Sequence, residues 1–237
     1  MKRRIVGLLT LAASLTPVLS GAGHAWFPRL DLTLTSDYIL RGYSQSANDP
    51  VLQFGVTARH RSGFVGGLWG SGVEFDRDDR VENPRRLEIR GFAGYVRPVG
   101  QSWVINGMVV RYQYPRADPL ADASSSEISA SVAWRDALSF TLAYSPDVFG
   151  SDRSGLLSEL SGRVSIAGAI DLSGGIGYAD LQLPGVSDYS YGHAGIGRSF
   201  GRFSIEAGYY YSDADPIPRW GEVVEGRWVA TLSTGFP

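Results

Sequence analysis

The sequence predicts an all-β protein, a closed antiparallel transmembrane β-barrel of about twelve strands. Strand-like stretches are joined alternately by very short turns and by long polar loops. Within the stretches, apolar and polar residues alternate with a period of two. Beyond the first 25 residues, no stretch reaches the ~20 apolar residues that a spanning helix needs. Short turns at one end and long loops at the other are typical of bacterial outer-membrane barrels, whereas a soluble β-sandwich, the less favoured alternative, does not require them.

Residues 1–25 are predicted to form a signal peptide. A basic segment at positions 2–4 precedes the apolar stretch Ile5–Leu19, and Gly23-His24-Ala25 is a small-x-small cleavage site. Cleavage after Ala25 would leave residues 26–237 as one outer-membrane barrel.

The strands follow from the alternation, taken in chain order. Clean alternation covers residues 30–35, 52–59, 86–90, 127–135, 138–145, 203–209 and 228–236. Residues 64–75 and 172–178 are rich in glycine, which specifies the register weakly, and residues 103–114 are apolar on both faces. With the remaining stretches these give about twelve strands, with about ten or fourteen as alternatives; an even number brings both termini to the periplasmic side.

The connections between these strands differ in length. Short turns are expected at 61–63, 98–100, 135–137, 168–169 and 200–202. Longer loops are expected around 48–50, 76–84, 115–126, 146–154, 181–188 and 212–225. The short turns would face the periplasm and the long loops the outside.

Aromatic residues flank the predicted strand ends. Trp103 and Trp134 lie beside short turns, and tyrosines at 112, 114, 144 and 209–211 lead into long loops. Such rings prefer the headgroup level of a membrane, so they are expected to form two girdles. Carbohydrate stacking and core packing are the alternatives. The last strand ends at Phe236, one residue before the C-terminus, where barrel-assembly signals carry an aromatic residue.

Composition excludes several classes of function. The chain has no cysteine, which rules out disulfides, thiol catalysis and cysteine metal sites. Its formal net charge is −2, and the predicted signal peptide holds three of the 22 basic residues and none of the acidic ones. A basic surface for nucleic acid is therefore not expected. Every cation after the signal peptide is an arginine; either guanidinium recognition of carboxylates and phosphates or GC-rich codon usage explains this.

Two segments carry a family resemblance. Residues 36–46 (Ser-Asp-Tyr-Ile-Leu-Arg-Gly-Tyr-Ser-Gln-Ser) and 49–55 (Asp-Pro-Val-Leu-Gln-Phe-Gly) resemble the opening signature of the TorF family of porins. Similar glycine–aromatic motifs follow at 62–75, 91–95, 112–115, 144–150 and 199–201. The resemblance implies a Gram-negative outer-membrane barrel that passes small solutes or ions. It brings no catalytic or binding residues with it.

Charged residues on the polar faces of the strands are the candidates for lining a pore. A charge facing lipid costs about 2–4 kcal/mol at the midplane, so these side chains are expected inside the barrel. The candidates are Asp37, Arg41, Arg86, Glu88, Arg90, Glu127, Glu159, Arg163 and Glu206, with Asp37 and Arg41 placed on the outer end of the first strand. These side chains would either line a channel and set its selectivity by their charge, or pair with one another and fill the lumen.

The function favoured by these patterns is an outer-membrane channel for passive diffusion. A barrel of about twelve strands is wider than a filled eight-stranded one and narrower than a general porin, which suits small solutes or ions. Its expected partners are outer-membrane lipid, lipopolysaccharide and the barrel-assembly machinery. A structural or adhesive barrel that acts through its outer loops is the first alternative.

A barrel hydrolase is the second alternative. It would need His60 or His193, the histidines outside the signal peptide, beside a serine and an acidic partner. The acidic run Asp76-Arg77-Asp78-Asp79 lacks the glycine and final glutamate of a calcium loop. The sequence therefore predicts no catalytic residue, no metal site and no cofactor.

Overall fold

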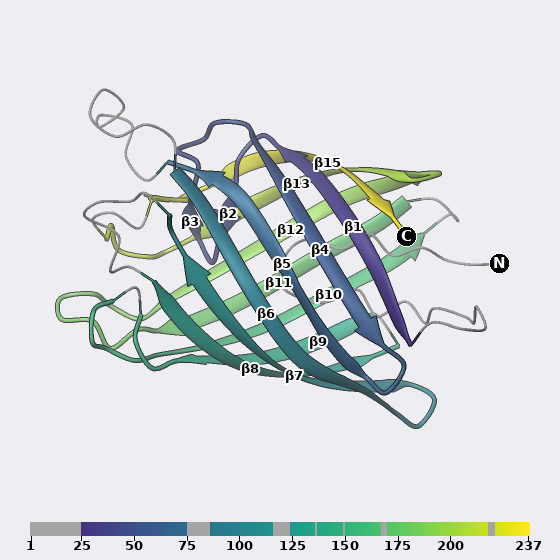
Figure 1. Ribbon diagram of the computed structural model, residues 1–237. Coiled ribbons are helices and arrows are strands. Elements are labelled where there is room, and N and C mark those ends of the chain that lie inside the picture. Colours follow the sequence, from purple (N-terminus) through teal and green to yellow (C-terminus); the bar gives the residue numbers. More distant parts are fainter. Residues whose placement is uncertain are drawn as a thin grey trace.

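A closed barrel dominates the computed structural model, which describes residues 25–74, 86–115, 124–135, 137–148, 150–166, 170–217 and 221–237. Its twelve long strands are all antiparallel to their neighbours, and the last strand pairs with the first (Figure 1). Among the described residues, no helix has the length and apolar character needed to cross a membrane. The predicted fold class and strand number are confirmed.

The barrel strands run in chain order around the ring. They are β1 (Trp26–Thr35), β4 (Val51–His60), β5 (Phe64–Val73), β6 (Arg86–Val99), β7 (Trp103–Gln113), β8 (Ser125–Trp134), β9 (Leu138–Ser145), β10 (Gly155–Ile166), β11 (Ile170–Asp180), β12 (Tyr189–Phe200), β13 (Phe203–Ser212) and β15 (Arg227–Phe236). Leu30 lies opposite Phe236, and Leu34 lies opposite Leu232, where β1 and β15 close the ring. Closure leaves no strand edge unpaired, which is what a strand-built membrane span requires.

Connection lengths differ between the two ends of the barrel, as predicted. The described short turns include 61–63, 100–102 and 201–202, and each holds a glycine with positive φ, a backbone conformation that other residues adopt at a cost. Long connections at the opposite end include 36–50, 146–154, 181–188 and 213–226. The predicted loop 76–84 and most of 115–126 lie outside the described residues, as do parts of the turns at 135–137 and 168–169.

Apolar side chains cover the outside of the barrel. Leu52, Ile176 and Trp228 are 61%, 67% and 70% exposed. Such exposure would be a large liability in water but is expected of a surface that faces lipid. Together with the closed fold, this apolar coat places the protein in the outer membrane.

The aromatic girdles are confirmed in part. Trp103 and Trp134 point outward near the short turns, and Tyr144, Tyr209 and Tyr211 point outward near the long loops.

Three other tyrosines predicted for the girdles face the lumen instead: Tyr112, Tyr114 and Tyr210. The reason is the two-residue period of a strand. Because Tyr209 and Tyr211 face lipid, Tyr210 between them must face inward, and the same alternation turns Tyr112 inward.

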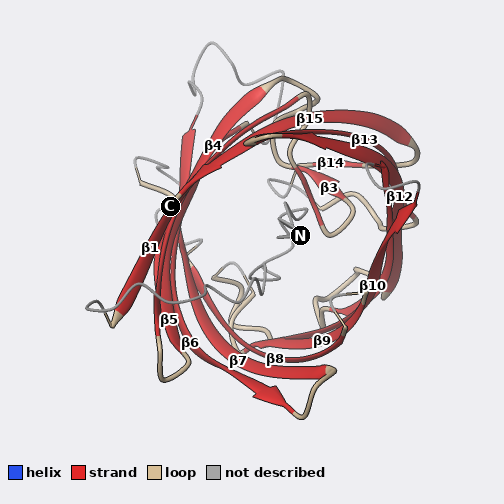
Figure 2. Ribbon diagram, turned by 90° about the vertical axis from the view of Figure 1, so that its right-hand side faces the viewer, coloured by secondary structure: helices blue, strands red, loops and turns tan. Residues whose placement is uncertain are grey.

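The chain folds into the lumen directly after β1. Figure 2 shows β3 (Tyr43–Ser44) and β14 (Glu222–Val223) inside the ring of strands, where they form a small sheet with β2 (Ile39–Leu40). We call residues 36–47 the lumen segment. The prediction that Asp37 and Arg41 share one face near the outer end of the first strand is wrong, because β1 ends at Thr35 and both residues lie in the lumen segment.

Candidate functional site in the barrel lumen

The lumen segment is fastened to β15 through Asp37. Asp37 Oδ1 accepts hydrogen bonds from the hydroxyls of Ser44 and Ser46 at 2.6 and 2.8 Å. Asp37 Oδ2 accepts one from Arg227 Nη1 at 2.7 Å, and its side chain is fully buried. Arg227 also donates to Glu222 on β14 at 3.2 Å. One carboxylate therefore holds the turn of the segment and ties it to the wall.

A second ion pair fastens the segment to the opposite wall. Arg41 donates from Nη1 and Nη2 to the two carboxylate oxygens of Glu127 on β8, at 2.7 and 3.0 Å. Burial alone would lower the pKa of Arg41, but the charge of Glu127 raises it well above its usual value, so Arg41 remains charged. Since β8 and β15 are six positions apart in the twelve-stranded ring, the segment crosses the lumen.

A buried cluster fills the lumen beside β5, β6 and β7. Arg90 donates to both the Tyr38 hydroxyl and the Glu88 carboxylate. Its guanidinium lies 4.4 Å from the Trp69 ring centroid and 4.7 Å from that of Tyr112, which are favourable cation–π distances. Apolar residues around these rings complete the cluster, so this side of the lumen is closed.

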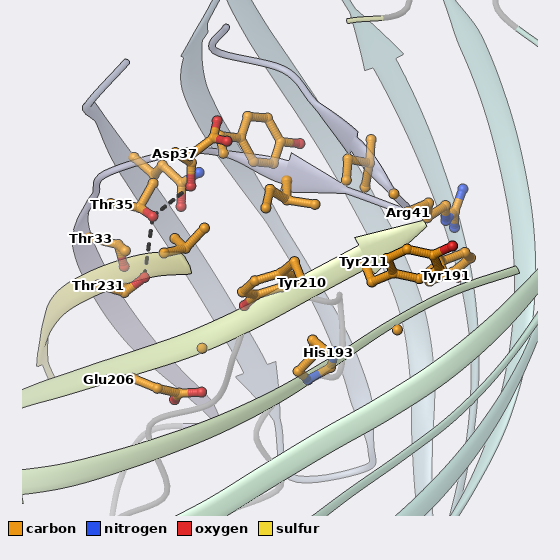
Figure 3. Close-up of a pocket in the computed structure, with 18 of the residues that line it drawn as sticks. Thr33, Thr35, Asp37, Arg41, Tyr191, His193, Glu206, Tyr210, Tyr211 and Thr231 are labelled. Atoms are coloured by element: carbon orange, nitrogen blue, oxygen red, sulfur yellow. Dashed lines mark hydrogen bonds between the residues drawn. The ribbon is translucent and has the colours of Figure 1, made fainter. Parts of the chain in front are cut away.

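The other side of the lumen is hollow. A cavity of about 120 Å³ lies between the lumen segment and strands β1, β12, β13 and β15 (Figure 3). Hydroxyl side chains line much of it, among them Thr33, Thr35 and Thr231, and Thr231 hydrogen-bonds Thr35 at 3.2 Å. Apolar surface from Ile39, Leu40 and Val229 completes the lining, so the cavity wall is mixed, with hydroxyl groups set among apolar side chains.

Besides Asp37, two carboxylates line this cavity, and their partners differ. Glu206 accepts hydrogen bonds from Arg163 at 2.9 Å and from Ser173 at 2.8 Å. Glu159 accepts one from the Tyr191 hydroxyl at 3.0 Å and, among the described residues, has no ion pair. Glu159 thus brings to the cavity a carboxylate that has no direct ion pair among the described residues.

Eight of the nine predicted pore-lining residues have described side chains, and all eight lie inside the barrel. Six of them form three pairs, Arg41–Glu127, Arg90–Glu88 and Arg163–Glu206, while Asp37 pairs with Arg227. Arg86 begins β6, but its side chain is outside what the structure describes.

Two lumen residues, Arg227 and Tyr38, are not among the predicted lining residues. Arg227 could have been found by extending the alternation one residue before Trp228, because its neighbour faces lipid and it must face inward. Tyr38 gave no such signal, since it lies beyond the end of a strand.

The two histidines do not assemble a hydrolase triad. His60 Nδ1 lies 2.7 Å from the Ser62 hydroxyl at an exposed turn, and the His193 ring stacks on Tyr210 at 5.3 Å in the lumen. Within the described ranges neither imidazole hydrogen-bonds a carboxylate, which the triad needs to orient its base. Over the same residues, no cluster of three or more histidine and acidic side chains could hold a metal ion.

Glycine at position 42 is required by the path of the lumen segment. Its φ is +89°, and a Cβ there would lie 2.7 Å from Ser212 Cβ and 3.2 Å from Tyr191 Cβ. In Gly42→Ala, the left-handed conformation alone costs about 1–2 kcal/mol, so release of the segment should rise about tenfold. Trypsin cleavage after Arg41, followed by mass spectrometry of the folded protein, measures that release.

The control is Gly201→Ala, which has a positive φ of +59° but nothing within 4 Å of the added Cβ. Cleavage after Arg41 should be unchanged in this variant. Equal cleavage in Gly42→Ala and wild type would show that the segment does not depend on this close contact.

A sealed ring of strands with an apolar exterior and a polar, partly filled lumen defines an outer-membrane β-barrel of the porin-like class. The chain belongs to the Gcw_chp family, described as a bacterial protein of unknown function, whose model matches residues 26–236. No curated protein matches the chain by sequence.

Solved structures of outer-membrane porins share the fold. The NanC porin aligns with a TM-score of 0.61 at 8% identity, covering 88% of this chain and 99% of the porin. The KdgM porin aligns with a TM-score of 0.55 at 9% identity, covering 88% of this chain and 99% of the porin. An outer membrane channel from Pseudomonas putida F1 aligns with a TM-score of 0.50 at 10% identity, covering 88% of this chain and 94% of the channel. At these identities the likeness concerns the architecture.

Proposed function

We propose that this protein is an outer-membrane channel for passive diffusion of small solutes or ions, narrowed by the lumen segment. The observation that carries the proposal is the asymmetric filling of the lumen. The segment is held at both walls and packed against β5–β7, while a cavity with hydroxyl and carboxylate groups in its lining remains beside β12, β13 and β15. Passage would follow this hollow side, with selectivity set by its bore and its lining charges.

The predicted charged residues take two roles in this proposal. Glu159, Arg163 and Glu206 line the path, because they surround the hollow side. Asp37, Arg41, Glu88, Arg90 and Glu127 hold the constriction, because their partners fix the lumen segment and the cluster around it. Arg86, at the start of β6, is proposed as a further lining residue.

The porin architecture of the structural neighbours supports this function. The resemblance of residues 36–46 to the TorF opening signature supports it further, since those residues include almost the whole lumen segment. The proposal includes cleavage of residues 1–25 as a signal peptide, insertion by the barrel-assembly machinery, and contact with lipopolysaccharide. It assigns no enzymatic role.

Planar-bilayer recording of the purified protein tests the proposal. Discrete conductance steps are expected, with a small unit conductance because the lumen segment occupies part of the bore. The contradicting outcome is a silent bilayer although the folded barrel has inserted. That outcome would favour a structural barrel, for which the extensive pairing of lumen charges is the favouring observation.

Glu159 is expected to give the channel a preference for cations. Glu159→Gln removes a negative charge that faces the cavity without an ion pair, so the cation-to-anion permeability ratio should fall about twofold. Reversal potentials in a salt gradient measure this ratio. Asp188→Asn is the matched control, because Asp188 lies in an exposed loop and accepts a hydrogen bond from Tyr178. An equal shift in both variants would contradict a local role for Glu159.

A further inference from the structure

Arginines on the outer surface gather at the short-turn end of the barrel. Arg97 on β6 lies opposite Ile105, and Arg198 on β12 lies opposite Ile205. Both isoleucines face lipid, and directly opposed residues share a face of the sheet, so both arginines point outward. Each lies two residues from the end of its strand, about 7 Å along it, within reach of the headgroups for a long side chain.

One group of these residues lies on β12, β13 and β15. The guanidinium of Arg198 is 4.9 Å from the Phe200 ring centroid. Arg202, in the β12–β13 turn, lies 5.7 Å from the ring centroid of Phe236. Phe203 lies directly opposite Phe200. Two cations therefore each lie beside an aromatic ring at this end of the barrel.

A second group lies on the opposite wall, on β6, β7 and β8. Trp103 lies opposite Trp134, and the guanidinium of Arg135 is 5.0 Å from the Trp134 ring centroid. Arg97 is on the neighbouring strand, where Val99 lies opposite Trp103. Strands β6–β8 and β12–β15 are half a ring apart, so the two groups are on opposite sides of the barrel.

These arginines have no anionic partner in the described part of the protein. None of Arg97, Arg135, Arg198 and Arg202 forms an ion pair with a described carboxylate. A guanidinium at the edge of the hydrocarbon is unfavourable unless an anion is near, and a phosphate accepts two of its N–H groups in a planar fork. Aromatic rings beside the cations sit at the same headgroup level.

The long-loop end of the outer surface differs. There, Arg111 on β7 faces outward and donates hydrogen bonds to Ser126 at 3.0 Å and to Ser124 at 2.6 Å. The exposed connections there carry acidic residues, including Asp152 and Asp188. The arginine–aromatic arrangement is thus a feature of the short-turn end.

We propose that the two groups, Arg198–Phe200–Arg202–Phe236 and Arg97–Trp103–Trp134–Arg135, each bind the phosphate of an anionic phospholipid of the periplasmic leaflet. The guanidinium groups bind the phosphate, and the rings pack against the glycerol and upper acyl chains. The interaction anchors the short-turn end at the inner boundary of the membrane. It goes beyond the proposed channel activity and does not depend on it.

Native mass spectrometry of the folded protein in neutral detergent tests this proposal. The probes are phosphatidylglycerol and phosphatidylcholine of the same chain length, titrated separately. Wild type should bind phosphatidylglycerol about tenfold more tightly than phosphatidylcholine, and each double variant should lose most of that preference at its own group. The variants are R198Q/R202Q, R97Q/R135Q and their combination, each checked for heat-modifiable gel mobility so that only folded barrels are compared.

The control variant is Arg111→Gln, which removes an outward arginine from the other end and should leave the preference intact. Equal affinity of wild type for the two lipids would overturn the proposal. It would also be overturned if the folded double variants kept the full preference, or if Arg111→Gln alone abolished it. Because the two groups are on opposite walls, each double variant tests one group even if the combined variant does not fold.

Discussion

Replacing Asp37 with asparagine is expected to increase single-channel conductance severalfold. The amide side chain would fill the same space as the carboxylate. It would lose the negative charge that pairs with Arg227 at 2.7 Å and accepts from Ser44 and Ser46. Removing one partner of a buried ion pair costs about 3–5 kcal/mol. Here Arg227 would keep only the half-exposed Glu222, at 3.2 Å, as an anionic partner. The lumen segment should then leave its position across the barrel and widen the bore.

Single-channel recording of Asp37→Asn and Arg227→Gln, singly and together, measures the effect. Both single variants should raise the conductance, and the double variant should add little, because the two residues act through one interaction. The matched control is Asp31→Asn. Asp31 lies on β1, faces the lumen and pairs with Arg29 at 2.7 Å. Unlike Asp37, it does not contact the lumen segment.

Unchanged conductance in a folded Asp37→Asn barrel would show that the lumen segment does not limit passage. An equal rise in Asp31→Asn would show that general lumen charge, and not the position of the segment, sets the conductance. Either result would refute the constriction assigned to residues 36–47.

Replacing Leu160 with arginine is expected to lower the free energy of unfolding by about 2–4 kcal/mol, the cost of a charge on the lipid face near the midplane. Leu160 is near the middle of β10, is 40% exposed, and lies between the outward-facing residues Phe140 and Ile176. Urea unfolding of the protein in phospholipid bilayers measures the loss.

Ser161→Arg is the control for this prediction. Ser161 is the next residue along β10 and faces the lumen, where its hydroxyl lies 2.8 Å from that of Ser139. An arginine there meets water and neighbouring polar groups, so its cost should be much smaller. Equal destabilisation by the two substitutions would contradict the assignment of the lipid and lumen faces.

The barrel itself could be predicted because its signal is local. Alternation at Leu52, Gln53 and Phe54 predicts that the two apolar side chains face lipid and that Gln53 faces the lumen. The structure confirms this assignment. The same rule would have assigned Tyr112 and Tyr210 to the lumen. Their aromatic side chains favoured a place in the girdles, but the two-residue period of the strand turns both side chains inward.

The lumen segment could not be predicted in the same way. Residues 36–47 directly follow a strand, and their sequence carries no signal that they turn into the lumen. Their inward path depends on turns at Arg41 and Gly42, whose φ values are +50° and +89°. It also depends on partners that are brought close only when the ring closes.

Local sequence was enough to predict the all-β class, the two faces of each strand, and the inward position of the charged side chains, because each of these depends on neighbours a few residues away. Tertiary structure alone decided which charges meet. Arg41 pairs with Glu127 across 86 residues of sequence and Asp37 with Arg227 across 190, and only the closed ring sets those distances. Ring closure also places the lumen segment across the bore. Because this short segment is too small to fill the whole lumen, a cavity remains on the side of β12, β13 and β15.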